Sequence, residues 1–241
     1  DIKDGKVRLI SATPTTSTIS LDGAKGYNNG VYLLDKTCKT LYNNSKLANN
    51  VQNLKIEDIQ KYLTYDYTQY ENSNVNTGKY EGTKVISDTN YRYYPNLFSK
   101  EKSGTVDDML GTELNFSEQK YPIEETFTQA KINLKVKQTF WKKAMQESDF
   151  LNPIYYKLFI KNINYYWLSS RGVGIGITRA YYCIRMAGHE EIKGWDLYMS
   201  DNNIDSNTSN FRPIVTLNSN VQIDIENSGD GSTREQAYII K

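Results

Sequence analysis

The stretch Tyr165-Tyr-Trp-Leu-Ser-Ser-Arg-Gly-Val-Gly-Ile-Gly176 decides the fold. Its first seven residues are rich in aromatic side chains, as strands are, and the glycine-rich run after Arg171 predicts a turn of the sheet. Further strand-like segments follow at Arg179–Met186, Gly194–Met199 and Phe211–Leu217. A hairpin between Val221–Ile225 and Ala237–Ile240 is expected to close the chain. The last third of the sequence therefore predicts a mainly antiparallel sheet.

The N-terminal part predicts helices that pack on this sheet. A strand is expected at Val7–Ile10, and the segment Ser20–Gly26 predicts a break in the chain. Apolar residues then recur at three- and four-residue steps, which is typical of an amphipathic helix, at Tyr27, Val31, Leu34, Cys38 and Leu41. A second short helix is expected at Lys55–Leu63, and Phe150–Ile160 also favours a helix over a strand. The predicted fold class is α+β.

The middle of the chain follows no clean period. Residues 64–94 are polar and rich in tyrosine, and they predict a long surface loop of the kind that is often functional. Lys100–Asn115 predicts a second excursion, and the alternation within Gln129–Ala144 predicts a strand. Because the chain shows no internal repeat and no linker, we expect residues 1–241 to form a single domain.

Composition excludes several classes of function. The 241 residues include 29 Lys plus Arg and 28 Asp plus Glu, which argues against a dedicated nucleic-acid-binding or polybasic membrane-binding protein. Apolar runs are too short to span a membrane, so we expect no membrane contact by this chain. The 20 tyrosines, together with abundant Asn and Ser, are typical of recognition surfaces, and equally of a Gram-positive surface protein. Since the sequence opens at Asp1 without a Met, inside an expected strand, any signal peptide or anchor would lie upstream.

Two segments resemble a known family. Tyr166–Arg171 and Phe211–Leu217 are similar to the C-terminal signature of bacterial domains with a C-type-lectin-like fold, which include relatives of the formylglycine-generating enzyme. Three upstream segments resemble surface proteins of clostridia-like bacteria in the same group, namely Gly26–Leu34, Cys38–Tyr42 and Leu54–Ile59. The resemblance implies a C-type-lectin-like domain, truncated at its N-terminus, of an exported surface protein that is often pilin-like.

The function that this resemblance implies is recognition or assembly, without catalysis, outside the cell or at its surface. The expected partners are a cell-surface protein, a glycan or filament subunits, as for the head of a pilin-like adhesin. One alternative is the receptor-binding domain of a phage tail or bacteriocin, since the same fold occurs there. A second alternative is extracellular DNA or glycan binding through a face where lysine and tyrosine interleave, beginning at Lys61 and Tyr62. A packed aromatic loop that covers the core explains the same interleaving.

Candidate binding residues lie in this tyrosine-rich region, where rings could stack on sugars or bases: Tyr65, Tyr67, Tyr70, Tyr80, Arg92 and Tyr93. Trp167 is expected to be a buried anchor, and Arg171 and Arg212 are expected to brace loops more than to bind ligand. Cys38 and Cys183 form either one disulfide or, as the sequence favours, two buried thiols.

The sequence offers little for catalysis. His189 is the single histidine and lies between Gly188 and Glu190, which predicts a solvated hairpin turn. The enzymes of the family use a pair of cysteines in the C-terminal core, and here Cys38 belongs to the first helix, so the resemblance does not extend to their activity. We expect no cofactor, with calcium as the one ion to consider, at Asp201, Asn203 and Asp205 in a loop before the last long strand. Turns rich in Asn and Asp without metal are the more common explanation.

Overall fold

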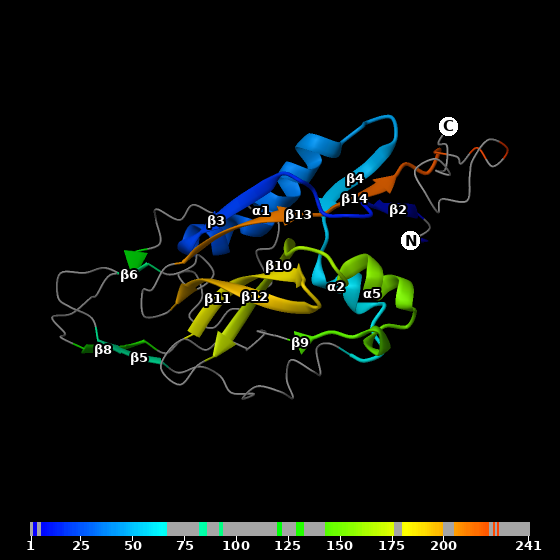
Figure 1. Cartoon of the computed structure of the whole chain (residues 1–241). Helices are drawn as coiled ribbons and strands as arrows, with labels where there is room; N and C mark the ends of the chain where they lie inside the picture. The colour runs from blue at the N-terminus through cyan, green and yellow to red at the C-terminus, as the bar shows by residue number, and fades with distance from the viewer. Residues whose placement is uncertain are drawn as a thin grey trace.

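The protein is described by a computed structural model, which covers residues 2–3, 6–66, 82–85, 92–93, 120–121, 129–132, 143–175, 180–199, 205–221, 224 and 226. These residues form an α+β structure, as the sequence predicted, and it contains two larger sheets and a few helices (Figure 1). The long helix α1 (Gly23–Tyr42) lies above the strands β10–β12 in Figure 1, and the short helices α2 (Ile56–Gln60) and α5 (Pro153–Phe159) lie together at their right-hand end. A single 3₁₀ turn, Glu147–Asp149, precedes α5.

The six-stranded sheet is the centre of the molecule. Its strands lie in the order β3–β13–β10–β11–β12–β9, and they pair antiparallel except for the parallel pair β10 and β13. Their bounds are β3 (Thr18–Asp22), β13 (Ser206–Phe211), β10 (Tyr166–Ile175), β11 (Ala180–Gly188), β12 (Glu191–Met199) and β9 (Lys143–Ala144). The sheet is thus mainly antiparallel, and its edge strand β3 comes from the N-terminal part of the chain.

A four-stranded antiparallel sheet lies beside it. Its order is β1 (Ile2–Lys3), β2 (Lys6–Ile10), β14 (Pro213–Leu217) and β4 (Ala48–Asn53), so segments from both ends of the described chain pair with each other. Two smaller pairs join β5 (Gly82–Val85) to β8 (Gln129–Ile132), and β6 (Arg92–Tyr93) to β7 (Lys120–Tyr121). The predicted strand Gln129–Ala144 is therefore two separate strands, β8 and β9, in different sheets.

The predicted single strand Phe211–Leu217 is wrong. Phe211 ends β13 in the six-stranded sheet, and Pro213 begins β14 in the four-stranded sheet, with Arg212 between them. Proline cannot donate a ladder hydrogen bond and suits the first residue of a strand. The segment Ser206–Asn210, expected in a loop, belongs to β13 because it pairs with β3.

Two predictions about glycine are also wrong. Strand β10 continues through Gly172 and Gly174 to Ile175, because β11 pairs with it along this run, and the irregularity lies earlier, between Trp167 and Arg171. The expected break at Ser20–Gly26 is instead the end of β3 and the start of α1. A Cβ on Gly26 would lie 2.9 Å from the carbonyl carbon of Leu21, so glycine here permits close packing of helix on strand.

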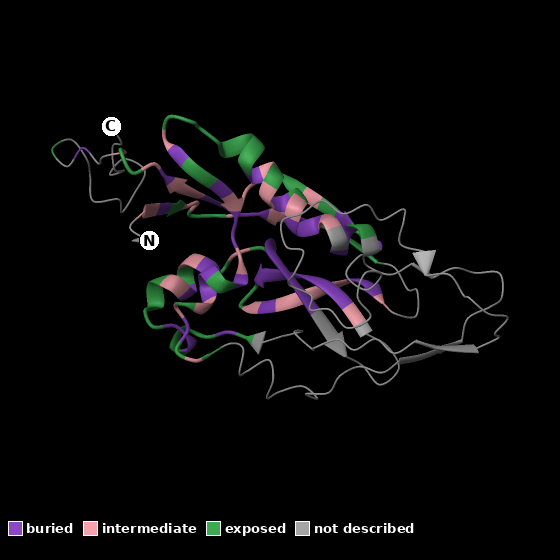
Figure 2. Cartoon of the chain, turned by 180° about the vertical axis from the view of Figure 1, so that it is seen from behind, coloured by how far each residue is buried: buried purple, intermediate pink, exposed green. Residues whose placement is uncertain are grey.

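Two clusters of buried side chains lie on the two faces of the six-stranded sheet. Figure 2 colours the buried residues of the helices and strands purple. The first core cluster packs α1 on the sheet and contains Val31, Leu34, Trp167 and Ile184. The second core cluster packs α2 and α5 on the opposite face and contains Ile59, Phe159, Tyr166, Leu168 and Ile192. Tyr166, Trp167 and Leu168 in β10 alternate between the clusters, as successive side chains of a strand do. The sheet is thus buried on both faces. Residues of α2 and α5 also lie next to residues of β2.

Candidate functional site

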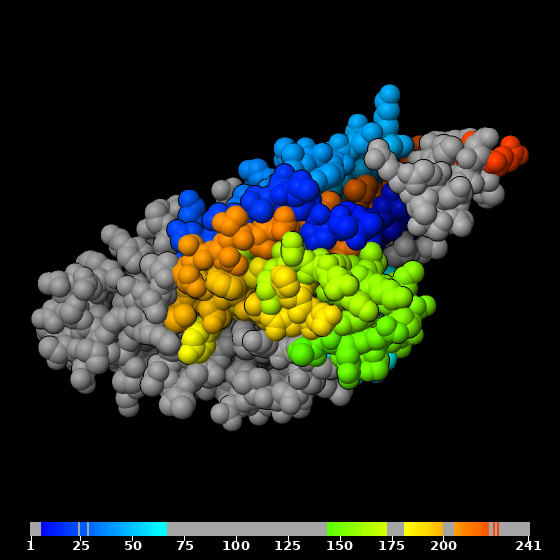
Figure 3. Space-filling view, viewed as in Figure 1, coloured from blue at the N-terminus to red at the C-terminus, as the bar shows by residue number. Residues whose placement is uncertain are grey.

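A surface pocket of about 120 Å³ lies where β2, α2 and α5 meet, and we call it the aromatic pocket. In Figure 3 the blue residues of the N-terminal strands lie beside the green residues of the segment that includes α5. The lining residues are mostly apolar or aromatic, with three charged side chains: Arg8, Leu9, Ile10, Leu54, Asp58, Lys61, Tyr62, Tyr155, Leu158, Phe159 and Ile214. A concave apolar site with a few fixed polar groups is the usual form of a binding site.

Stacked rings form one wall of the aromatic pocket. The rings of Tyr62 and Tyr155 lie 3.7 Å apart with planes 19° from parallel, and Phe159 stacks more distantly on both. The Nζ atom of Lys61 lies 4.9 Å from the centre of the Tyr62 ring. Burial, followed by the neighbouring Tyr155 phenol, raises the pKa of Tyr62, so this hydroxyl stays neutral at physiological pH. The wall is therefore apolar and carries a cation at its rim.

A buried ion pair ties β2 to α2. Nη1 of Arg8 donates to Oδ1 of Asp58 at 2.6 Å, and both side chains are less than a tenth exposed. The other carboxylate oxygen of Asp58 accepts from the backbone N–H of Lys55 at 3.2 Å and so caps the start of α2. Because each charge meets an opposite one, the pair adds no net charge to the pocket and holds two of its walls in place.

Arg212 ties the remaining wall to β2. It is fully buried, and its guanidinium group donates to the carbonyl oxygens of Ser11 and Ala12, just after β2, and to that of Leu158 in α5. These donor–acceptor distances run from 2.6 to 3.0 Å. The rings of Phe159 and Tyr166 lie 5.7 and 5.4 Å from its central carbon. The two arginines thus fix β2, α2 and α5 relative to one another before any ligand arrives.

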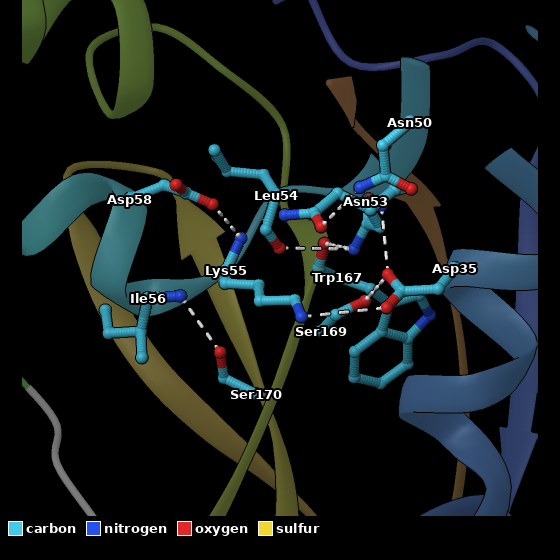
Figure 4. Close-up of polar contacts among 11 residues, drawn as sticks. Asp35, Asn50, Asn53, Leu54, Lys55, Ile56, Asp58, Trp167, Ser169 and Ser170 are labelled. Carbon is cyan, nitrogen blue, oxygen red and sulfur yellow. Dashed lines mark hydrogen bonds and ion pairs between the residues drawn. The ribbon is translucent and has the colours of Figure 1, made fainter. Parts of the chain in front are cut away.

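A polar network behind the pocket joins α1 to the strands (Figure 4). Oδ1 of Asp35 accepts from the backbone N–H of Asn53 at 3.0 Å and from the hydroxyl of Ser169 at 2.8 Å, and Lys55 lies 3.8 Å from the other oxygen. The Asn53 amide donates to the carbonyl of Trp167 and accepts from the N–H of Arg212. Burial raises the pKa of Asp35 in spite of these contacts. The hydrogen bonds of Asp35 hold α1 against β4 and β10.

The structure places few of the predicted binding residues. Tyr65 is half-buried, packs against the second core cluster and donates its hydroxyl to the sulfur of Met145, so its ring covers the core. Arg92 and Tyr93 form β6 and pair with Tyr121 and Lys120. The remaining predicted residues lie outside the described residues: Tyr67, Tyr70 and Tyr80.

The other residues singled out from the sequence have structural contacts. Trp167 is fully buried, and its indole N–H donates to the carbonyl of Ile19. Nε of Arg171 donates to the carbonyl of Tyr27 in α1 at 3.0 Å. Cys38 and Cys183 are both buried and free, so the disulfide alternative is wrong. Burial, assisted by the charge of Asp35, raises the pKa of the Cys38 thiol to about 12, which keeps it protonated and unreactive.

His189 lies on the two-residue turn between β11 and β12, as predicted. It is exposed, and both His189 and Glu190 have positive φ, 47° and 60°, as a type I′ hairpin turn requires. Its ring lies 4.5 Å from that of Tyr165, whose hydroxyl donates to Glu191. Lys193 completes this group with a 3.1 Å contact to Glu191. The polar groups of Tyr165, Glu191 and Lys193 therefore pair with one another beside this turn.

Of the three proposed calcium ligands, the structure describes Asp205. Asp201 and Asn203 are outside the described residues. The carboxylate of Asp205 is exposed and accepts from the backbone N–H of the next residue, Ser206, at 2.8 Å. Within the part of the chain that the structure describes, no group of three His, Cys, Asp or Glu side chains is placed to hold a metal ion.

Most of the aromatic pocket was not predicted from the sequence. The interleaved lysine and tyrosine from Lys61 and Tyr62 onward were recognised, but not that Tyr155 and Arg8 would join them. These residues lie far apart along the chain, and nothing local brings them together. One signal was present, because Tyr155 and Leu158 lie on a side of α5 that the core-facing residues Tyr156 and Phe159 leave open.

Comparisons with known proteins do not assign this chain to a family. Within the described residues, the helices lack the combination of length and apolar character that crossing a membrane requires. No family model, no curated protein and no solved structure matches the chain.

Proposed function

We propose that this chain is a non-enzymatic recognition or assembly domain of an exported bacterial surface protein, and that it binds its partner through the aromatic pocket. The observation that carries the proposal is the pocket itself, an apolar hollow whose three walls are held by buried arginine contacts. A site that is already formed loses less conformational entropy on binding. The context at the cell surface, as the head of a pilin-like adhesin, is supported by the sequence resemblance.

The same proposal assigns the chain a C-type-lectin-like fold. Its support is the resemblance of Tyr166–Arg171 and Phe211–Leu217 to the signature of that group, together with the places these segments occupy. The first lies in β10 at the centre of the six-stranded sheet, and the second spans the passage from β13 to β14. Both segments therefore contribute to the framework on which α2 and α5 rest.

The chemistry of the aromatic pocket favours binding over proton transfer. Arg8 and Asp58 are engaged with each other at 2.6 Å, and the raised pKa of Tyr62 keeps its hydroxyl neutral. General acid–base catalysis uses a group whose pKa lies near the working pH. The pocket instead offers apolar area, ring edges and fixed charges, which are the means of recognition.

The test compares the purified chain with Tyr155→Ser on an array of glycans and of short peptides. We expect saturable binding to one of these classes and about a tenfold or greater loss for the variant, because truncating a central aromatic residue removes an anchor. Tyr42→Ser is the matched control, since Tyr42 is 41% exposed at the end of α1 and lies outside the pocket lining. Circular dichroism checks that each variant folds. Equal binding by both variants, or no saturable binding at all, contradicts the proposal.

A further inference from the structure

The stacked tyrosines restrict what can enter the aromatic pocket. One face of the Tyr62 ring lies against Tyr155 at 3.7 Å, and the ammonium group of Lys61 lies over the Tyr62 ring at 4.9 Å. Sugars and nucleic-acid bases bind aromatic residues chiefly by stacking on an open ring face. The Tyr62 ring therefore has little open face for a ligand, and the lining also presents the aliphatic side chains of Leu9 and Leu158. Such a lining favours an apolar group.

The size of the pocket sets the size of that group. Its volume of about 120 Å³ is close to that of an engineered protein cavity of roughly 150 Å³ that binds benzene. One leucine or phenylalanine side chain therefore fits, and a larger ring system does not. Leu54, Phe159 and Ile214 are almost fully buried in the core and also line the pocket, so an inserted side chain would contact the core directly.

Exposed apolar residues extend the site beyond the pocket. Leu9 lines the pocket and is 42% exposed, while Leu151 and Ile154 are 66% and 61% exposed. Leu151 donates its backbone N–H to the carbonyl of Tyr62, and Ile154 directly precedes Tyr155, so both lie close to the stacked rings. These exposed apolar side chains favour a ligand that extends beyond the pocket, such as a segment of a polymer.

The charged residues around the rim of the pocket favour particular residues beside the inserted side chain in the bound segment. Arg8 and Asp58 neutralise each other inside the pocket. Lys61 lines the pocket and is exposed, and Lys157 is exposed and directly precedes the lining residue Leu158 in α5. A binding segment with acidic residues would meet complementary charge here, whereas a basic one would be repelled.

We propose that the aromatic pocket binds a linear peptide segment that inserts one leucine- or phenylalanine-sized side chain and carries acidic residues beside it. The inference rests on the proposed function and narrows it to a protein partner. The inserted side chain supplies affinity by burying apolar area against Tyr155 and Leu158, as anchors of linear motifs do. The acidic residues contact Lys61 and Lys157, so the affinity falls as salt concentration rises.

The experiment is a selection from a displayed library of random peptides of about nine residues on the whole chain, with Tyr155→Ser used in parallel for subtraction. We expect enriched peptides that share one large apolar residue flanked by Asp or Glu. Fluorescence polarisation with a labelled enriched peptide should show about tenfold or greater weakening for Tyr155→Ser and for replacement of its anchor by serine. Lys61→Glu should weaken acidic peptides several-fold and leave a peptide with neutral flanks nearly unchanged.

Three outcomes overturn the inference. Enrichment that is the same on Tyr155→Ser, or enriched peptides without an apolar anchor, shows that peptides do not use the pocket. Enrichment of basic flanks contradicts the charge argument. Binding of a glycan that Tyr155→Ser abolishes, with no peptide enriched, leaves the proposed function standing and rejects the peptide, whereas the absence of both kinds of binding rejects the two proposals together.

Discussion

Arg212 is a fully buried cation whose guanidinium group is bonded to three backbone carbonyls. Those carbonyls belong to Ser11, Ala12 and Leu158, which lie in segments far apart in the sequence. The planar fork of arginine can serve several acceptors at once, whereas the ammonium group of lysine is a compact point with three donors. At the scale of single residues, this side chain therefore decides how β2 and α5 lie against each other.

Replacing Arg212 should destabilise the whole fold. Arg212→Met removes the charged donor from three part-buried carbonyls, and because a hydrogen bond to a charged group contributes about 1.5–3 kcal/mol, a loss of about 3 kcal/mol or more in the free energy of unfolding is expected. Urea denaturation measures it. Lys46→Met, at an exposed lysine, is the matched control and should change stability by no more than about 0.5 kcal/mol. Similar values for the two variants would show that the carbonyl contacts carry little energy.

At the scale of elements, α1 packs on its neighbours through two glycines. A Cβ on Gly26 would meet backbone of Leu21 at 2.9 Å, whereas a Cβ on Gly30 would meet the ends of side chains, the nearest being those of Ile184 and Leu21 at 3.2 Å. Backbone cannot yield without moving a strand, but side-chain ends can shift by a few tenths of an ångström. The two positions therefore differ in tolerance although both lie in the same helix.

Replacing each of these two glycines by alanine should distinguish the effect of packing on stability from the effect of helix propensity. Alanine stabilises a helix interior by about 1 kcal/mol relative to glycine. We expect Gly26→Ala to destabilise by about 1–3 kcal/mol because overpacking outweighs this gain, and Gly30→Ala to lie within about 1 kcal/mol of the wild type. Chemical denaturation of the two variants side by side gives the comparison. A Gly26→Ala protein that is more stable than the wild type would contradict the close approach of α1 to β3.

At the scale of the whole molecule, one sheet carries both core clusters. Trp167 belongs to the first cluster, whereas its neighbours Tyr166 and Leu168 in β10 belong to the second. Because adjacent residues of one strand serve opposite faces, neither cluster can lose its packing without disturbing the strand that supports the other. The described residues that form the two clusters are accordingly expected to unfold as one cooperative unit.

Cooperative unfolding can be tested with one core substitution in each cluster. Leu34→Ala and Ile59→Ala each remove a fully buried side chain and should cost about 2–5 kcal/mol. In both variants, tryptophan fluorescence and far-ultraviolet circular dichroism should report the same, lowered midpoint. If Ile59→Ala increased hydrogen exchange in α2 and α5 while the fluorescence midpoint stayed at its wild-type value, the clusters would be separate units.

The sequence by itself determined the features that depend on local spacing. The apolar period from Tyr27 to Leu41 predicted α1, because side chains three and four residues apart share a helix face. The turn at His189 and the helix within Phe150–Ile160 were likewise predicted from neighbouring residues, since turn and helix preferences act over a few positions.

Tertiary structure alone decided where segments distant in the sequence meet. By local sequence, Phe211 and Pro213 look like parts of one strand. Their pairing partners separate them, because β13 pairs with β3 and β14 pairs with β2, in two different sheets. The aromatic pocket depends in the same way on Arg8, Tyr62 and Tyr155 coming together. Their contact follows from burial on both faces of a sheet and from two buried arginines, and these are properties of the folded chain that no local pattern of residues contains.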